Sequence, residues 1–440
     1  MEARDAAPVS PSSVVLLADQ VLTLDAAATI HAPGAVTVEG AEIRAVGPPP
    51  ERPAGEIVDL RGSVLLPGLV NTHTHTPMWV FRGLTEDVPR GEWLTGRLLP
   101  LERRLGPDDL RSGALAGCLE LLLNGVTTIA DRYGHMDAVA TAVEASGLRA
   151  VVGHSLYDRT AEADLALSER LIERFGTDPA RSRVWAGLAP HATDTCGPDL
   201  LRRVRRLADR TGAHVFIHVA QSEEEVATVA ARGAAGCASY LDALGLLAPD
   251  VVAAHAIYLS DAEADLVGSR RTAVAHCPSS NAKLEGRVAP IARMRRAGAI
   301  VGLGTDAACC NNGMDLFEEM KVAGLLNKVA AGDPAALPAL DLLRAATSEA
   351  ARALGIDHLV GTLEPGKRAD IIAVRTRSPR LLPWHDPVAN LVYAVRGSDV
   401  VAVFVDGRQL VRGGRVMHLD SERILADAER AAGRLVDVRV

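Results

Sequence analysis

The sequence has no excess of basic charge, no long apolar run and no metal-type cysteine pair. Its 47 basic side chains stand against 55 acidic ones and leave a net charge of −8. This balance argues against a nucleic-acid partner, because phosphate binding needs clustered Lys and Arg. One basic cluster is present, but its helical spacing is typical of a solvated helix face; it comprises Arg202, Arg203, Arg205 and Arg206.

The lack of a long apolar run is informative about where in the cell the protein is located. No segment is long and apolar enough to cross a bilayer, and residues 1–13 contain no apolar signal-peptide core. We therefore expect a cytoplasmic protein without a membrane partner. The six cysteines have no Cys-x-x-Cys spacing, which predicts free thiols in a reducing compartment. Adjacent Cys309 and Cys310 could suggest a disulfide or a metal site, but neighbouring cysteines rarely bridge each other.

Composition and strand rhythm indicate a globular chain with more than one domain. Hydrophobic residues make up 48% of the 440 residues and charged residues 23%. Residues 1–12 are expected to be a flexible tail. Short period-two runs rich in Val and Ile fill residues 13–66 and return in residues 360–440. This pattern predicts one small sheet domain built from both chain ends, followed by a C-terminal tail.

Residues 67–359 alternate short apolar segments with longer helical patterns. Such alternation predicts an α/β fold, a (β/α)₈ barrel whose parallel strands are joined by crossover helices. The helical patterns include DLRSGALAGCLELLLNG and GPDLLRRVRRLADRTG. The strand candidates are TTIADR, RAVVGHS, RVWAGLAPH, HVFIHVAQS, VVAAHA, TAVAHCP and AIVGLGTD.

Polar side chains at the predicted strand ends carry the functional signal. In such a barrel the catalytic groups lie at the C-terminal ends of the strands, and both imidazoles of a His-x-His pair point into the mouth. A lone histidine there is more often a hydrogen-bonded core or loop residue, and a lone aspartate could cap a helix. The whole set is hard to explain that way: His73, His75, His191, His218, His255 and Asp306.

Four of these residues predict a metal site. A divalent transition metal accepts imidazole and carboxylate ligands, and a catalytic site leaves one position open for water. We therefore expect one divalent ion, Zn²⁺ with Fe²⁺ as the alternative, because both metals accept these ligands. The predicted ligands are His73, His75, His218 and Asp306.

Several long motifs resemble the amidohydrolase superfamily, in the cytosine-deaminase and s-triazine-hydrolase-like branch that includes methylthioadenosine/S-adenosylhomocysteine deaminases. The resemblance runs nearly end to end and implies a distorted (β/α)₈ TIM barrel with a β-sandwich made from both termini. It also implies a homo-oligomer, a dimer or a tetramer. The matching blocks, in order, are PGLVNTHTHTPMWVFRGLTEDVPRGEWL, GLAPHATDTCGPDLL, HVFIHVAQSEEEV, AHCPSSNAKL, GLGTDAACCNNGMDLFEEMK and GTLEPGKRADIIAV.

The resemblance implies a role for each matching position. It gives the same four metal ligands, with Asp306 also acting as general base. His255 looks like the histidine that hydrogen-bonds the metal-bound water, and His191 is similar to a substrate-contacting histidine. Glu92, in GEWL, matches a glutamate that grips the ribose hydroxyls in nucleoside deaminases; a solvated or capping carboxylate is the alternative.

One position departs from the pattern of the deaminases. In these enzymes the third histidine begins a His-x-x-Glu motif, whose glutamate protonates the ring nitrogen beside the attacked carbon. Here the run is HVAQ, and the amide of Gln221 donates a hydrogen bond but cannot shuttle a proton. A polarised substrate could need only that hydrogen bond, or Asp306 or Cys310 could supply the proton, or catalysis could be lost. Deaminating triazine hydrolases pair such a cysteine with an acidic residue next to the metal aspartate, and in this chain Ala307 occupies that position.

The three glutamates that follow, Glu223 to Glu225, are expected at the start of the next helix, where acidic side chains complement the helix dipole. The sequence as a whole predicts a metal-dependent amidohydrolase that removes an amino group from a heterocyclic small molecule by a metal-activated hydroxide. Purines, pterins, triazines and nucleosides are the substrate classes. The alternatives are loss of halide or alkylamine from a similar ring, which Gln221 favours, and a non-catalytic metal-binding homologue.

Overall fold

The computed structural model describes residues 13–436. The segment 1–12, expected to be a flexible tail, and residues 437–440 lie outside the described part of the chain. Within it, no helix has the length and apolarity needed to cross a membrane. All six cysteines are buried and free, including the adjacent pair Cys309 and Cys310.

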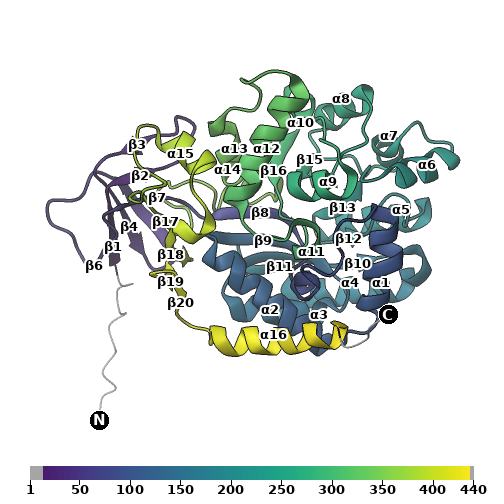
Figure 1. The fold of residues 1–440 in the computed structure, drawn as a ribbon, viewed down its shortest axis with the longest axis horizontal. Coiled ribbons are helices and arrows are strands. Elements are labelled where there is room, and N and C mark those ends of the chain that lie inside the picture. The colour runs from purple at the N-terminus through teal and green to yellow at the C-terminus, as the bar shows by residue number, and fades with distance from the viewer. Residues whose placement is uncertain (1–12, 437–440) are drawn as a thin grey trace, which may run out of the picture.

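A ring of parallel strands forms the centre of the larger part of the molecule (Figure 1). The predicted strand segments all appear, and the third of them, RVWAGLAPH, is split into two strands. Its nine strands are β8 (Leu69–Thr74), β9 (Val126–Tyr133), β10 (Arg149–Leu156), β11 (Val184–Ala186), β12 (Ala189–Pro190), β13 (Val215–Val219), β14 (Val251–His255), β15 (Ala273–His276) and β16 (Ile300–Leu303).

The ring consists of two sheets that isolated bridges close into a barrel. The sheet orders are β11-β10-β9-β8 and β13-β14-β15-β16. A bridge from Leu188 to Val215 joins one pair of edges, and a bridge from Thr74 to Asp306 joins the other. Apolar side chains such as Val151 and Phe216 fill the interior. The barrel interior is therefore a packed core, and the predicted site residues lie at its mouth.

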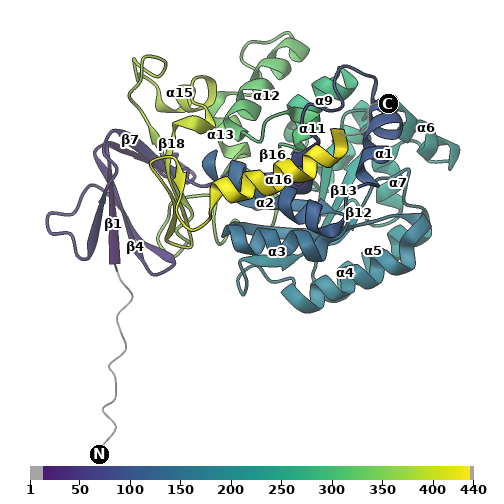
Figure 2. The same ribbon diagram turned by 60° about the horizontal axis from the view of Figure 1, so that its bottom comes forward.

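Helices surround the barrel between successive strands (Figures 1 and 2). In α5, Gly197 is the N-cap, Pro198 is the first helical residue, and Gly212 ends the helix as its C-cap with a φ of 71°, as is usual for helix ends. The main helices are α2 (Pro107–Leu123), α3 (Met136–Ser146), α4 (Ala161–Phe175), α5 (Pro198–Thr211), α6 (Glu223–Ala231), α7 (Cys237–Ala243), α8 (Asp261–Ser269), α9 (Pro278–Glu285), α10 (Ile291–Arg296), α11 (Ala308–Asn311), α12 (Leu316–Ala331), α13 (Ala339–Ala345) and α14 (Ser348–Ala353).

The basic cluster on α5 is solvated, as its helical spacing indicated. Arg202 pairs with Asp199, and Arg203 pairs with Glu162 on α4. Arg205 pairs with Asp250 at 2.6 Å. Three of the four arginines therefore have carboxylate partners within the described chain, as on an ordinary charged helix face.

Two further sheets lie beside the barrel. One has the order β5-β4-β1-β6, and the other combines strands of both chain ends in the order β20-β19-β18-β17-β7-β2-β3. Buried side chains of both sheets share one apolar cluster. Their strands are β1 (Ser13–Ala18), β2 (Gln20–Leu22), β3 (Ile30–His31), β4 (Gly34–Glu39), β5 (Glu42–Gly47), β6 (Glu56–Asp59), β7 (Ser63–Pro67), β17 (Ile371–Arg375), β18 (Val400–Val405), β19 (Arg408–Arg412) and β20 (Arg415–Val416).

The C-terminal region differs from the expected sheet and tail. Helix α16 (Ser421–Val436) runs back along α2, as Figure 2 shows. It buries Ile424, Ala428, Ala431 and Leu435, which recur every three or four residues. That period defines an amphipathic helix, and its apolar stripe covers Ala116 and Leu119 of α2. A second helix, α15 (Pro387–Tyr393), lies between β17 and β18.

Candidate active site

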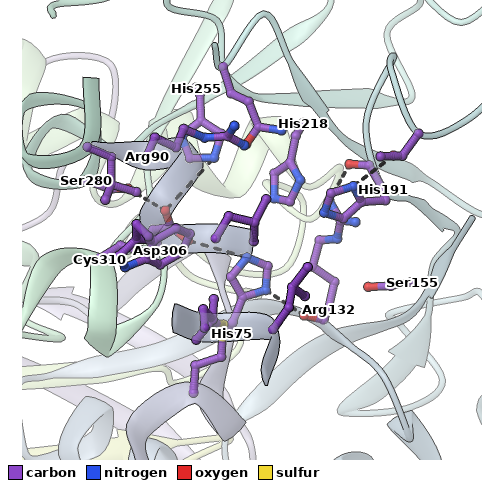
Figure 3. A pocket seen from close by; sticks show the side chains of 18 of the residues that line it. His75, Arg90, Arg132, Ser155, His191, His218, His255, Ser280, Asp306 and Cys310 are labelled. Atoms are coloured by element: carbon purple, nitrogen blue, oxygen red, sulfur yellow. Dashed lines mark hydrogen bonds and ion pairs between the residues drawn. The ribbon is translucent and has the colours of Figure 1, made fainter. Parts of the chain in front are cut away.

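Three histidines and an aspartate from the ends of three strands meet at the barrel mouth, and Figure 3 shows His75, His218 and Asp306 of this set. His73 and His75 lie on β8, His218 lies on β13, and Asp306 follows β16. A ligand atom from each histidine lies within 4.8 Å of those of the other two. The Nε2 atoms of His73 and His75 lie 3.7 and 3.4 Å from Asp306 Oδ1. The structure thus brings together all four residues that the sequence predicts as metal ligands.

The His73 imidazole indicates that this donor set fits a cation. Its Nε2 is buried and has no hydrogen-bond partner within residues 13–436. Burial, and then the neighbouring His75, hold the His73 pKa well below its ordinary value, so the ring is neutral. A buried neutral imidazole with a free lone pair beside a carboxylate is a typical transition-metal ligand. Three imidazoles with one carboxylate suit zinc and leave a position for water.

Asp306 is held in place by donors on its two oxygens. The hydroxyl of Ser280 donates to Oδ2 at 2.5 Å, and the backbone N–H of Ala307 donates to Oδ1 at 2.8 Å. Burial alone would raise the Asp306 pKa, but His255 and His75 hold it below its ordinary value. Its φ of 56° is a strained backbone conformation, of the kind found at functional sites. Asp306 is therefore an ionised carboxylate, able to accept a proton.

Two histidines are oriented by acceptors behind them. His75 Nδ1 donates to the backbone oxygen of Arg132 at 2.6 Å, and His255 Nδ1 donates to Asn281 Oδ1 at 2.9 Å. These bonds fix the proton on Nδ1 and leave each Nε2 as the free nitrogen. His255 Nε2 lies 4.0 Å from Asp306 Oδ2. His255 therefore faces the carboxylate across the space in which a reacting water would lie.

A cavity of about 440 Å³ opens beside the four-residue cluster, and His191, Gln221 and Cys310 line it. His191 is fixed by a 2.8 Å contact between its Nδ1 and Thr195 Oγ1, and its ring stacks on Tyr157 at 4.7 Å. The structure thus brings three more predicted site residues to the same space as the metal ligands. Apolar side chains from the segment after β8 complete the walls, among them Met78, Trp93, Leu94 and Leu98.

The glutamates after Gln221 begin α6, as expected. Ser222 caps this helix by accepting from the backbone N–H of Glu225 at 3.2 Å. Glu225 is fully buried, and burial raises its pKa to about 7. Its carboxyl accepts from the backbone N–H of Gln221 at 2.8 Å. Glu225 therefore fixes the backbone of Gln221. It does not line the cavity, so it does not replace the glutamate that the deaminase motif has at position 221.

Glu92 is the predicted site residue that the structure does not bring to the cavity. Its side chain is 54% exposed and accepts from Arg97 Nη2 at 3.1 Å. The next residues, Trp93 and Leu94, do line the cavity. This geometry matches the alternative of a solvated carboxylate, and the ribose-binding role stays a prediction.

Sequence reasoning missed the polar groups around the metal ligands. Ser280 and Asn281 lie on α9 and contact Asp306 and His255 only through the tertiary fold. Arg132 and several other polar side chains of the cavity wall were also missed. Arg132 ends the strand run TTIADR, so the strand-end rule that found the histidines would have found it as well. The other wall residues are Arg90, Ser155, Tyr157 and Glu285.

Comparison with known proteins gives consistent matches. The model of the amidohydrolase family matches residues 64–410. A 5-methylthioadenosine/S-adenosylhomocysteine deaminase of Pelotomaculum thermopropionicum is 40% identical over 431 residues, covering 97% of this chain and 99% of the relative. A 5'-deoxyadenosine deaminase of Methanothermobacter thermautotrophicus is 43% identical over 386 residues, covering 87% of this chain and 90% of the relative.

Solved structures share the fold. An adenosine deaminase from Xanthomonas campestris with bound zinc superposes with a TM-score of 0.94 at 32% identity, covering 98% of this chain and 100% of that one. The atrazine chlorohydrolase of Arthrobacter aurescens, complexed with zinc, gives a TM-score of 0.90 at 25% identity, covering 95% of this chain and 100% of that one.

Proposed function

Because the chain belongs to the amidohydrolase family and is a metal-dependent hydrolase that deaminates by hydrolysis, we propose that its substrate is an adenosine-type nucleoside. The observation that carries this proposal is the cluster of three imidazoles and one carboxylate at the barrel mouth. The relatives with this activity in their names match nearly the full length of the chain. We take Zn²⁺ as the ion, with Fe²⁺ as the alternative.

The chemistry needs a nucleophilic water, a base and a donor to the leaving group. His73, His75, His218 and Asp306 would hold a divalent ion, which when bound would lower the pKa of a water molecule towards neutrality. Asp306 takes the proton of that water as it attacks the amino-bearing ring carbon. His255, whose Nε2 faces Asp306 Oδ2, orients the water by a hydrogen bond. Asp306 then returns the proton to the departing amine.

Gln221 takes the place of an acid in this scheme. Its amide N–H donates to the ring nitrogen beside the attacked carbon, and the buried Glu225 behind it fixes the backbone at that point. His191, stacked on Tyr157 and following the strand next to that of Gln221, contacts the heterocycle. Since an amide cannot transfer a proton, the protons of this reaction pass through Asp306 alone.

The test is ammonia release by the zinc-loaded protein from adenosine, 5'-deoxyadenosine, 5'-methylthioadenosine and S-adenosylhomocysteine. We expect turnover of at least one of these nucleosides. The Asp306→Asn variant should lose at least about 10³-fold in kcat, because it lacks the general base. Zinc content measured on both proteins separates a lost base from a lost ion. No ammonia from any of the four nucleosides, at one zinc per chain, would overturn the proposal.

A second candidate is removal of halide or alkylamine from a related ring, and Gln221 favours it. A leaving group that departs without a proton on the ring makes less demand for an acid at this position. The fold similarity to an atrazine chlorohydrolase is compatible with that reaction. Chloride release from a chloro-s-triazine without ammonia release from the nucleosides would establish it. A large gain in deamination by Gln221→Glu would indicate the same.

The remaining assignments complete the proposal. We take the protein to be cytoplasmic and a homo-oligomer, a dimer or a tetramer. We take residues 67–359 as the catalytic barrel, and residues 13–66 with the strands of segment 360–440 as one β-sandwich that supports it, while α16 of that segment packs on α2 of the barrel. Cys310 lines the cavity and is kept as a substrate-side group, whereas Glu92, exposed and paired with Arg97, is taken as a solvated carboxylate. Size-exclusion chromatography with light scattering tests the oligomeric order.

A further inference from the structure

Arg132 is a buried cation on the cavity wall with part of its guanidinium free. It lies on β9, on the same face as Ala130, which points into the barrel core. Its side chain is only 2% exposed. Nη1 donates to the backbone oxygen of His191 at 3.1 Å, whereas Nε and Nη2 have no partner within the described residues. Figure 3 shows Arg132 between His75 and His191.

The carboxylates that line the cavity are engaged elsewhere. Glu285 lies 3.4 Å from Arg90 Nε and accepts from the Tyr258 hydroxyl. Glu102 accepts from the Tyr133 hydroxyl. Asp306 belongs to the metal-ligand cluster. Among residues 13–436, no carboxylate lies within ion-pair distance of Arg132. A buried charge without a partner is strongly unfavourable, so the missing counter-charge points to a ligand.

The free edge of Arg132 defines the shape of that ligand. Nε and Nη2 present parallel N–H bonds on one side of the planar guanidinium, the geometry that binds a carboxylate through both of its oxygens. Ser155, near the end of β10, lies on the same wall, and its hydroxyl has no hydrogen bond recorded within the described chain. Arg132 pairs in register with Gly153 of the adjacent strand, so Ser155, two residues further along β10, lies on the same face of the sheet and on the same cavity wall.

We propose that Arg132 and Ser155 bind a carboxylate of the substrate, so that the cavity selects anionic substrates over neutral ones of the same ring. The inference rests on the proposed function only in taking this cavity as the substrate site. Arg132 is then a specificity-determining residue: its two free N–H groups bind the carboxylate oxygens, and the ligand supplies the counter-charge. Tyr157, stacked on His191, and Arg159, 5.2 Å from the Tyr157 ring, extend the wall towards solvent.

Calorimetric titration of the zinc-loaded protein with benzoate and with benzamide tests this site. The two probes have the same shape, and only benzoate carries the charge. We expect binding of benzoate at millimolar concentration and much weaker binding of benzamide. Arg132→Met should weaken benzoate about 10- to 100-fold, the range for a hydrogen-bonded charge. Arg159→Met removes one positive charge from the exposed rim of the same cavity and serves as the matched control.

Each outcome decides the proposal. If benzoate still binds to Arg132→Met with wild-type affinity, the anion lies on the metal. If its affinity falls equally in Arg159→Met, the anion responds only to the general positive charge of the cavity. Either result overturns the proposal. If Arg132→Met weakens the binding of benzoate and benzamide equally, the Nε/Nη2 edge of Arg132 binds a neutral carbonyl group. That result also overturns the proposal. Arg132→Lys keeps the charge without the paired N–H edge and should bind with intermediate affinity; full wild-type affinity would contradict two-point binding. No outcome depends on turnover, so failure here is distinct from failure of the deaminase proposal.

Discussion

Two buried arginines on neighbouring strands show how differently the two ends of the barrel treat charge. Arg149 begins β10 and lies at the end opposite the mouth, whereas Arg132 is near the end of the paired strand β9. Both side chains are 2% exposed. Arg149 donates to both carboxyl oxygens of Asp370, at 3.0 and 3.1 Å, and also contacts Asp406. Arg132 has no carboxylate partner in the described chain.

The pKa directions of the two arginines reflect this difference. Burial lowers the pKa of Arg132 to about 10. Burial acts on Arg149 in the same sense, but Asp370 and Asp406 outweigh it and raise its pKa above the ordinary value. Asp370 and Asp406 flank the C-terminal strands β17 and β18, so the Arg149 cluster ties the closed end of the barrel to the adjoining sheet. At the end opposite the mouth the buried arginine is paired with carboxylates of the protein. At the mouth the buried arginine has no such partner in the described chain, so it can pair with a ligand.

The largest stability effect is expected from breaking the Arg149 cluster. Arg149→Met leaves the buried Asp370 carboxylate without its partner, which should lower the free energy of unfolding by about 3–5 kcal/mol. Arg132→Met removes an unpaired buried cation and should not lower it. Urea unfolding of both variants at one zinc content measures the contrast. Arg203→Met breaks an exposed pair with Glu162 and should change stability little. Equal losses in the Arg149 and Arg132 variants would contradict the comparison.

A smaller effect concerns Glu319, a buried carboxyl below the mouth. It accepts from the Ser279 backbone N–H at 3.2 Å and from Asn311 Nδ2 at 3.0 Å, and it has no cationic partner in residues 13–436. Burial raises its pKa to about 8. Between the ordinary value of 4.5 and about 8 the folded protein therefore holds a proton that the unfolded chain has released. Stability is highest below this window and falls as the pH rises through it.

Glu319→Gln should remove that pH dependence. Over one pH unit, between about pH 6 and about pH 7, the wild type should lose about 1.4 kcal/mol relative to the variant. Other titrating groups cancel in the difference between the two proteins. Parallel unfolding curves at both pH values measure it. A constant difference between the proteins across this window would show that Glu319 is ionised and that the mouth tolerates an unpaired anion as well.

The sequence could predict the barrel because its buried parallel strands are continuous apolar runs that end in polar residues. The same rule brought together the predicted metal ligands, since strand ends in a barrel converge whatever their separation along the chain. It could not reveal partners that only the fold provides. Asp370 lies 221 residues beyond Arg149, so no local pattern distinguishes the paired arginine from the unpaired one. The hydrogen bond from His255 to Asn281 of α9 likewise joins residues that are far apart in the sequence, so no local pattern predicts it.

Two other differences have local causes. Helix α16 was missed because the β-rich rhythm was continued past Val416, although Ile424, Ala428 and Leu435 already show the helical period. Glu92 was placed by its motif alone. A motif fixes the position in the chain but not the direction of the side chain, and here the turn that brings Trp93 and Leu94 to the cavity directs Glu92 to solvent.

Substitution of Glu92 is therefore expected to have the smallest effect on substrate binding, because this residue lies outside the cavity. An exposed pair with Arg97 contributes little, so Glu92→Gln should change the KM for a nucleoside by less than about 2-fold, equivalent to about 0.4 kcal/mol. Steady-state kinetics with adenosine and with 2',3'-dideoxyadenosine measure it, since only adenosine carries the ribose hydroxyls. A rise in KM above about 10-fold for adenosine alone would show that Glu92 turns inward to bind these hydroxyls. The mouth would then hold a carboxylate as well as an arginine that bind the substrate. It would differ further from the opposite end of the barrel, where the charged side chains pair with one another.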